Sequence, residues 1–195
     1  MAVTQPSAAD VEKDIAELLR EEEIGAVAVL DEEGFPSVAM MHFVGDHLTA
    51  YLHTFTYTRK YAGLLKDSRV SYTLAHMPQD GFAGRFQARH VQITGRASFL
   101  QDLNEIEHVV RLSHEQFDWL EDSPVYENFR RADLPLRQVF FRVDPLHGVW
   151  QDNRVRMMYR TKVRFSDDGK HVAELSPYPL TGPSVVLEAG GTVTR

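Results

Sequence analysis

The segment Ile24–Phe55, "IGAVAVLDEEGFPSVAMMHFVGDHLTAYLHTF", decides the fold class. Three runs within it, 24–31, 35–44 and 47–55, have the short, apolar, alternating pattern that is typical of strands. The letters "EEG" and "GD" near the run ends are short turn signals, and turns this short join antiparallel neighbours. The segment therefore predicts two consecutive hairpins that form an antiparallel meander.

Three helices are expected around these strands. The first begins at Asp10, after a disordered tail of residues 1–9, because an apolar stripe at helical spacing follows: Val11, Ile15, Leu18 and Leu19. The second lies within 58–67, with Thr58 as a possible N-cap. The third lies within 102–120, where Asp102 and Glu105 have capping-box spacing, and its expected buried stripe consists of Leu103, Ile106, Val110, Phe117 and Leu120.

The remaining segments read as strands. Runs 69–76, 86–100 and 137–151 have strand patterns, and 154–175 reads as a hairpin that turns at 167–169. Six or more strands joined by tight turns argue against a parallel sheet, because parallel neighbours need a crossover each time. The expected fold is mainly β (α+β): a six-stranded or larger antiparallel split β-barrel with peripheral helices. We expect one domain over 1–195, with the barrel over 10–180 and a helical insertion near 102–120.

Composition excludes several classes of function. The chain has 21 basic and 28 acidic residues, for a net charge of -7, so neither nucleic acid nor a membrane is expected as a partner. Because there is no cysteine, disulfides, thiolate metal sites and cysteine nucleophiles are excluded. None of the nine histidines falls into a compact ligand motif, so no metal is expected. The amino-terminal stretch lacks a signal-peptide pattern, and we expect a cytoplasmic protein.

A basic cluster stands out within "HTFTYTRKY", residues 53–61. If a strand ends near residue 55 and a helix begins at 59, the cluster lies at a helix N-terminus, where free N–H groups and the helix dipole favour an anion. Hydroxyl and cationic donors would then make a phosphate cradle, and they are Thr54, Thr56, Thr58, Arg59 and Lys60. The alternative is a threonine-rich strand followed by a solvated Arg-Lys pair.

A second basic pattern lies near the carboxyl end of the expected barrel. Even positions from 154 to 164 are basic except Met158, so a continuous strand would place five cations on one face. Such a face suits anionic partner groups, although a solvated outer face of a hairpin is the simpler interpretation. The residues alone favour the simpler one.

The order of these features resembles the pyridoxamine 5'-phosphate oxidase-like, FMN-binding split-barrel family. The resemblance covers roughly residues 10–180 and rests on the order of hairpins, the "T-x-x-x-T-R-K" element that ends at Lys60, the strand "R-H-V-Q-I-T-G" over 89–95, and "W-Q" at 150–151. It implies that the cradle holds the flavin phosphate. It also implies that Met40, Met41 and His42 lie beside the flavin ring, that His90 replaces a flavin-contacting glutamine, and that Trp150 and Arg160 approach the flavin.

The resemblance also marks departures at the substrate. Arg156 would bind the substrate anion, whereas Met158 stands where the family oxidase has a substrate-binding histidine. An imidazole can hydrogen-bond and carry charge, and a thioether cannot carry charge. The basic residues of the family's flavin strand are replaced as well, since that strand corresponds to 39–43, "AMMHF". Pyridoxamine phosphate is therefore not the expected substrate.

The expected function is an FMN-binding oxidoreductase that acts on a small organic molecule. The cofactor would be bound across a homodimer interface, Arg156 and Lys162 are candidates for fixing a substrate anion, and His42 or His90 for tuning the ring. Two alternatives stay open on the same scaffold: a reductase that uses a deazaflavin coenzyme, and a flavin or haem carrier without turnover. No catalytic residue can be named from the sequence.

Overall fold

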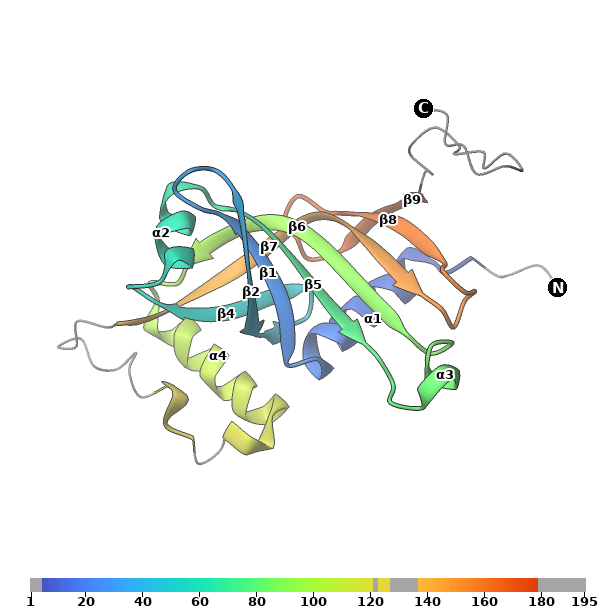
Figure 1. Ribbon diagram of the computed structural model, residues 1–195, viewed down its shortest axis with the longest axis horizontal. Coiled ribbons are helices and arrows are strands. Elements are labelled where there is room, and N and C mark those ends of the chain that lie inside the picture. The colour runs from blue at the N-terminus through green and yellow to red at the C-terminus, as the bar shows by residue number, and fades with distance from the viewer. Residues whose placement is uncertain (1–4, 121–122, 127–136, 179–195) are drawn as a thin grey trace, which may run out of the picture.

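A computed structural model describes residues 5–120, 123–126 and 137–178 (Figure 1). Its nine strands form one antiparallel sheet in the order β2-β1-β5-β6-β7-β4-β3, while β8 pairs with β7 and β9 with β8. The prediction of a mainly antiparallel sheet with peripheral helices is confirmed. The elements, in chain order, are α1 (Ala8–Glu21), β1 (Ile24–Leu30), β2 (Pro36–His42), β3 (Val44–Asp46), β4 (Thr49–Phe55), α2 (Arg59–Lys66), β5 (Arg69–His76), α3 (Gly81–Gly84), β6 (Arg89–Phe99), α4 (Leu103–Gln116), a 3-10 turn (Asp118–Leu120), β7 (Gln138–Asp152), β8 (Arg160–Phe165) and β9 (Val172–Pro177).

The sheet curls so that its two ends meet at Phe43. The strand expected over 35–44 breaks at this residue: β2 pairs with β1 at one end of the sheet, and β3 pairs with β4 at the other end. The predicted meander is therefore wrong at this point, because β2 does not pair with its successors. Phe43 has no exposed surface and packs against Tyr72, so burial of its ring accounts for the bend that brings the two ends of the sheet together.

The inner face of the curled sheet forms the main hydrophobic core. Alternate residues of β5 and β6 point into it, and helix α1 covers it with the predicted stripe of Val11, Ile15, Leu18 and Leu19, all fully buried. This helix begins at Ala8, earlier than expected, because Ser7 and Asp10 form a capping box. The predicted tail is therefore shorter than nine residues.

Helix α4 builds a second, smaller core on the outer face of β3, β4 and the first half of β7 (Figure 1). The predicted stripe is partly wrong: Ile106 is buried as expected, but Leu103 is 64% exposed and Val109 is buried instead. The capping box is also wrong. Asp102 caps the helix by accepting from Asn104 N, whereas the Glu105 carboxylate binds Arg142 at 2.8 Å.

The carboxyl-terminal hairpin is confirmed at its turn but begins later than expected. Strands β8 and β9 flank Gly169, whose φ of 71° suits the turn. Residues 153–159 form a turn between β7 and β8 rather than the start of a strand, so Arg154 and Arg156 do not share a strand face with Arg160. Within the described residues, no helix combines the length and the apolarity that spanning a membrane requires.

Candidate functional site

The residues of the cradle predicted from the sequence lie where β4 ends and α2 begins. Thr58 is the N-cap of α2: its hydroxyl accepts from Tyr61 N at 3.2 Å and donates to Phe55 O at 2.9 Å. The same hydroxyl lies 2.9 Å from the hydroxyl of buried Thr54. These bonds fix the strand-to-helix junction, so Thr54 and Thr58 shape the cradle.

The groups that remain free in the cradle are suited to an anion. The backbone N–H groups of Arg59 and Lys60 have no hydrogen-bond partner among the described residues, and neither does the Thr56 hydroxyl. Within the same part of the chain, neither the Arg59 nor the Lys60 side chain forms an ion pair, and the first turn of α2 contains no acidic residue. Two unpaired cations at the positive end of a helix dipole attract a phosphate.

The strand that should run beside a flavin ring exposes only one of its three predicted residues. Met40 is 66% exposed on β2, an edge strand that pairs only with β1. Met41 points into the core and is 7% exposed, so its predicted ring contact is not supported. His42 packs under α4, with its ring 5.0 Å from that of Phe117.

His42 belongs to a histidine and aromatic cluster that the sequence did not predict. Its Nδ1 lies 3.3 Å from the Glu23 carboxylate. Burial lowers the pKa of His42, and this effect outweighs the opposite effect of the Glu23 carboxylate. His53 lies beside it, with ring centroids 6.1 Å apart, and burial together with His42 lowers the pKa of His53 to about 4. The Nδ1 atom of His53 accepts from Gln138, so the ring is neutral and held in place. The alternation of side chains along β4 was the only sequence feature that could place His53 on the outer face. Helix α4 covers that face.

A second group of predicted residues lies elsewhere on the sheet, on its outer face. His90 of β6 pairs with Gln151 of β7, which pairs with Arg160 of β8, so the three side chains form a row across three strands. The Arg160 Nε donates to the Gln151 amide oxygen at 2.7 Å. Burial, followed by the charge of Arg160, lowers the pKa of His90.

Arg156 and Met158, the residues expected at the substrate, are exposed in the turn between β7 and β8. The Arg156 guanidinium lies over the Tyr159 ring at 5.8 Å. Met158 has a φ of 62°, and its backbone N–H is held at 2.9 Å by Asn153 Oδ1. Asn153 also donates to the carbonyl of Arg85, which ties this turn to the connection that contains α3.

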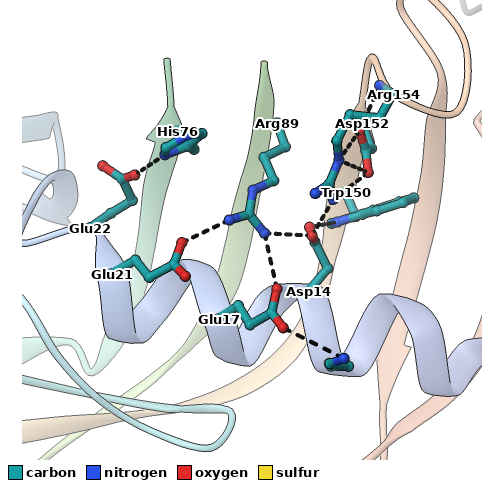
Figure 2. Close-up of polar contacts among 10 residues, drawn as sticks. Asp14, Glu17, Glu21, Glu22, His76, Arg89, Trp150, Asp152 and Arg154 are labelled. Carbon is teal, nitrogen blue, oxygen red and sulfur yellow. Dashed lines mark hydrogen bonds and ion pairs between the residues drawn. The ribbon is translucent and has the colours of Figure 1, made fainter. Parts of the chain in front are cut away.

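Trp150, which the resemblance would place beside the flavin, is buried within this chain. It is 2% exposed and points to the inner face, where its indole N–H donates to Asp14 of α1 at 2.7 Å (Figure 2). The other carboxylate oxygen of Asp14 accepts from Arg89 and Arg154, at 2.6 and 2.5 Å. Trp150 therefore anchors α1 to the sheet.

The same cluster explains part of the basic pattern near the carboxyl end. Arg154 pairs with Asp14 and Asp152, so its charge is neutralised within the chain (Figure 2). These contacts, with the Asp152 hydrogen bond largest, raise the pKa of Arg154. Of the five cations expected on one face, only Arg160, Lys162 and Arg164 lie on β8.

The structure thus separates the predicted site residues into two groups. Met40 and the cradle lie near β2, β4 and α2, whereas His90, Arg156, Met158 and Arg160 lie near the far ends of β6, β7 and β8 (Figure 1). Strands β1 and β5 lie between β2 and β6. Neither group contains a metal ligand set, since no cluster of three or more such side chains occurs in the described residues.

These features define a split β-barrel protein, with the exposed first turn of α2 at the end of β4. The family model described as pyridoxamine 5'-phosphate oxidase matches residues 11–147, which is well over half of the chain. The chain therefore belongs to this family. A search of curated proteins finds no match.

Solved structures share the fold at low sequence identity. A haem-binding protein from Mycobacterium smegmatis is 15% identical with a TM-score of 0.62, over 83% of this chain and 60% of that chain. The conserved hypothetical protein Rv2991 from Mycobacterium tuberculosis is 20% identical with a TM-score of 0.60, over 80% and 90%. HutZ, a haem storage protein from Vibrio cholerae, is 18% identical with a TM-score of 0.53, over 69% and 89%.

Proposed function

We propose that this protein binds FMN through the cradle at α2 and acts as a flavin-dependent oxidoreductase on a small organic substrate. The observation that carries the proposal is the set of free donors at the cradle. Two cations and two backbone N–H groups have no partner within the described residues, although the chain as a whole is acidic. A phosphate monoester fits this donor set in charge and in number of acceptors.

Each part of the cradle would have a definite task. Arg59 and Lys60 bind the phosphate, the Thr56 hydroxyl donates to it, and Thr54 and Thr58 hold the junction rigid. Met40, exposed on the adjoining edge strand, supplies an apolar contact for the ring. When bound, FMN supplies hydride exchange at N5 of its ring, while the protein orients the ring and excludes water.

The proposal includes a homodimer with the cofactor at the interface. On one chain, the cradle borders β7 near Gln138, whereas the row of His90, Gln151 and Arg160 crosses β7 at its other end. A second copy could place its row opposite the first copy's cradle, which would complete the site. Exposed apolar side chains on β2 support an interface there, since Val38 and Met40 are 65% and 66% exposed.

The substrate is proposed to differ from pyridoxamine phosphate. Met158 supplies neither charge nor a strong hydrogen-bond donor where the family oxidase has a histidine. The strand over 39–43 also lacks the basic residues of the family's flavin strand, and its last residue, Phe43, is buried in the core. Arg156 is exposed in the same turn as Met158 and is assigned to a substrate anion. The proposal keeps the cytoplasmic location expected from the sequence.

Haem binding is the second candidate, because two of the similar structures carry that description. It is supported by the fold alone, since the identities are 15% and 18%. The described residues contain no cluster of three metal-binding side chains, although a haem needs only one or two axial ligands. A deazaflavin coenzyme is the third possibility for the same scaffold.

The absorption spectrum and the mass of the copurified small molecule test these candidates together. A flavin spectrum with the mass of FMN, bleached on addition of NAD(P)H or another reductant, supports the proposal. A Soret band would favour haem, and a colourless protein that binds only a deazaflavin would favour the third candidate. Sedimentation of a fully flavin-loaded monomer would refute the dimer.

A further inference from the structure

A groove of about 560 Å³ lies on the outer face of the sheet, over β6 to β9. Its strand residues face away from α1, and none of its lining residues belongs to the cradle at α2. Its lining combines apolar surface with the polar side chains of Gln92, Thr94, His147, Lys162, Arg164 and Ser176.

The register of the strands explains how cations come to line this groove. Lys162 of β8 pairs with Val149 of β7 and Ser176 of β9, and Arg164 pairs with His147 and Glu174. Side chains two residues apart on a strand share a face and lie about 7 Å apart, so Arg160 lies next to Lys162 on this face, beside the residues that line the groove.

The charges along this strand are only partly balanced. Arg164 is neutralised by Glu174, with a shortest N–O distance of 3.0 Å. Arg160 is held by Gln151 and lies over the Tyr178 ring at 5.7 Å, and neither partner is an anion. Within the described residues the Lys162 ammonium makes no hydrogen bond or ion pair.

Neutral donors surround the unbalanced cations. The amide of Gln92 and the hydroxyls of Thr94 and Ser176 line the groove, and these side-chain groups make no hydrogen bonds within the described part of the chain. Glu174 is the groove's only lining carboxylate among the described residues, and it is already paired. Among the described residues, the lining thus offers donors and positive charge without an unpaired carboxylate.

We propose that this groove is a second anion-binding site, for a small molecule that carries phosphate or carboxylate groups. Lys162 is its principal charge partner, Arg160 contributes from one end, and the neutral donors fix the orientation of the anion. Binding at this groove requires neither the cradle nor a bound flavin. An exposed groove of this kind works through charge and several donors, so its affinity should fall as salt is raised.

The test uses the full chain with Arg59→Ala and Lys60→Ala, which disables the cradle. Inorganic pyrophosphate and citrate serve as the phosphate and carboxylate probes, and binding is measured by calorimetry at low salt. We expect one binding site per chain, about a tenfold loss of affinity when Lys162→Ala is added, and near-normal affinity with Lys162→Arg. Lys170→Ala is the matched control, because Lys170 is an exposed cation in the β8–β9 turn.

Histidine resonances locate the bound probe. The imidazole signal of His147, which lines the groove, should shift on binding, while that of His47, at the β3–β4 turn, should not. Binding of one probe but not the other identifies the source of the anion and supports the site. Three results would each overturn the proposal: equal effects of Lys162→Ala and Lys170→Ala, an unshifted His147 signal, or no binding of either probe by the full chain.

Discussion

Replacing Asp14 with alanine tests how α1 is attached to the sheet. Asp14 is 6% exposed and accepts from three donors: Trp150, Arg89 and Arg154 (Figure 2). Removing one partner of a buried ion pair typically destabilises a protein by about 3–5 kcal/mol, because the other charge stays buried without compensation.

The expected loss lies at the lower end of that range. Arg89 would keep Glu21 at 2.8 Å, and Arg154 would keep Asp152 at 2.7 Å, so neither guanidinium would be left without an anion. The Trp150 indole N–H would lose its only acceptor in the described residues, and this accounts for about 1–3 kcal/mol of the total loss if no water replaces the carboxylate. We therefore expect Asp14→Ala to lower the free energy of unfolding by about 3 kcal/mol.

Urea denaturation followed by circular dichroism measures this change. Glu17→Ala is the control on the same helix: its side chain is 43% exposed and its nearest oxygen lies 3.4 Å from Arg89, so we expect a loss under about 1 kcal/mol. Equal, small effects of the two substitutions would show that Asp14 does not hold α1 in place.

Two further substitutions probe the histidine cluster and the packing of α2. The pKa of His53 is lowered from 6.5 to about 4, so the unfolded chain binds more protons than the folded chain between those values, and stability falls as pH is lowered through this window. His53→Gln should remove up to about 3 kcal/mol of this acid-dependent loss of stability, as measured by denaturation from pH 7 to 4.5. His47→Gln, at an exposed turn, should leave the pH dependence unchanged. Identical pH profiles for wild type and His53→Gln would contradict the assignment. Gly63→Ala would place a Cβ 2.3 Å from the Leu30 carbonyl oxygen, so it should destabilise the protein by about 2 kcal/mol or more. Ala62→Gly in the same helix should cost about 1 kcal/mol. A melting temperature of Gly63→Ala equal to that of wild type would refute the close packing of α2 on β1.

Local patterns predicted those elements whose determinants lie within a few residues. The stripe of α1, the N-cap at Thr58 and the turn at Gly169 depend on neighbours in sequence, and all three occur as expected. The helix α4 was less accurately predicted, because contacts with distant strands set its buried face. Arg142 draws Glu105 away from the cap, and Ser113 is buried against Tyr126.

The candidate site was predictable only where it is local. The cradle lies within seven residues of sequence, whereas the orientation of Trp150 depends on its pairing with Val91 and on α1, which are distant in sequence. The basic run at 154–164 alternates as a strand would, but Asn153 and its bond to Met158 stabilise a turn there. Periodicity alone cannot distinguish these two structures, since the deciding contacts are between side chain and backbone.

The affinity ratio between FMN and riboflavin, measured in the wild type and in Arg59→Ala/Lys60→Ala, tests the central claim most directly. Riboflavin lacks the phosphate, so the ratio isolates what the cradle contributes. Two charge-assisted bonds of about 1.5 kcal/mol each predict that the wild type binds FMN about 100-fold more tightly, and that the ratio falls toward one in the double variant. Lys13→Ala/Lys170→Ala, which removes two exposed cations elsewhere, should keep the wild-type ratio. A ratio that is the same in all three proteins, or no FMN binding by the wild type, would contradict the account.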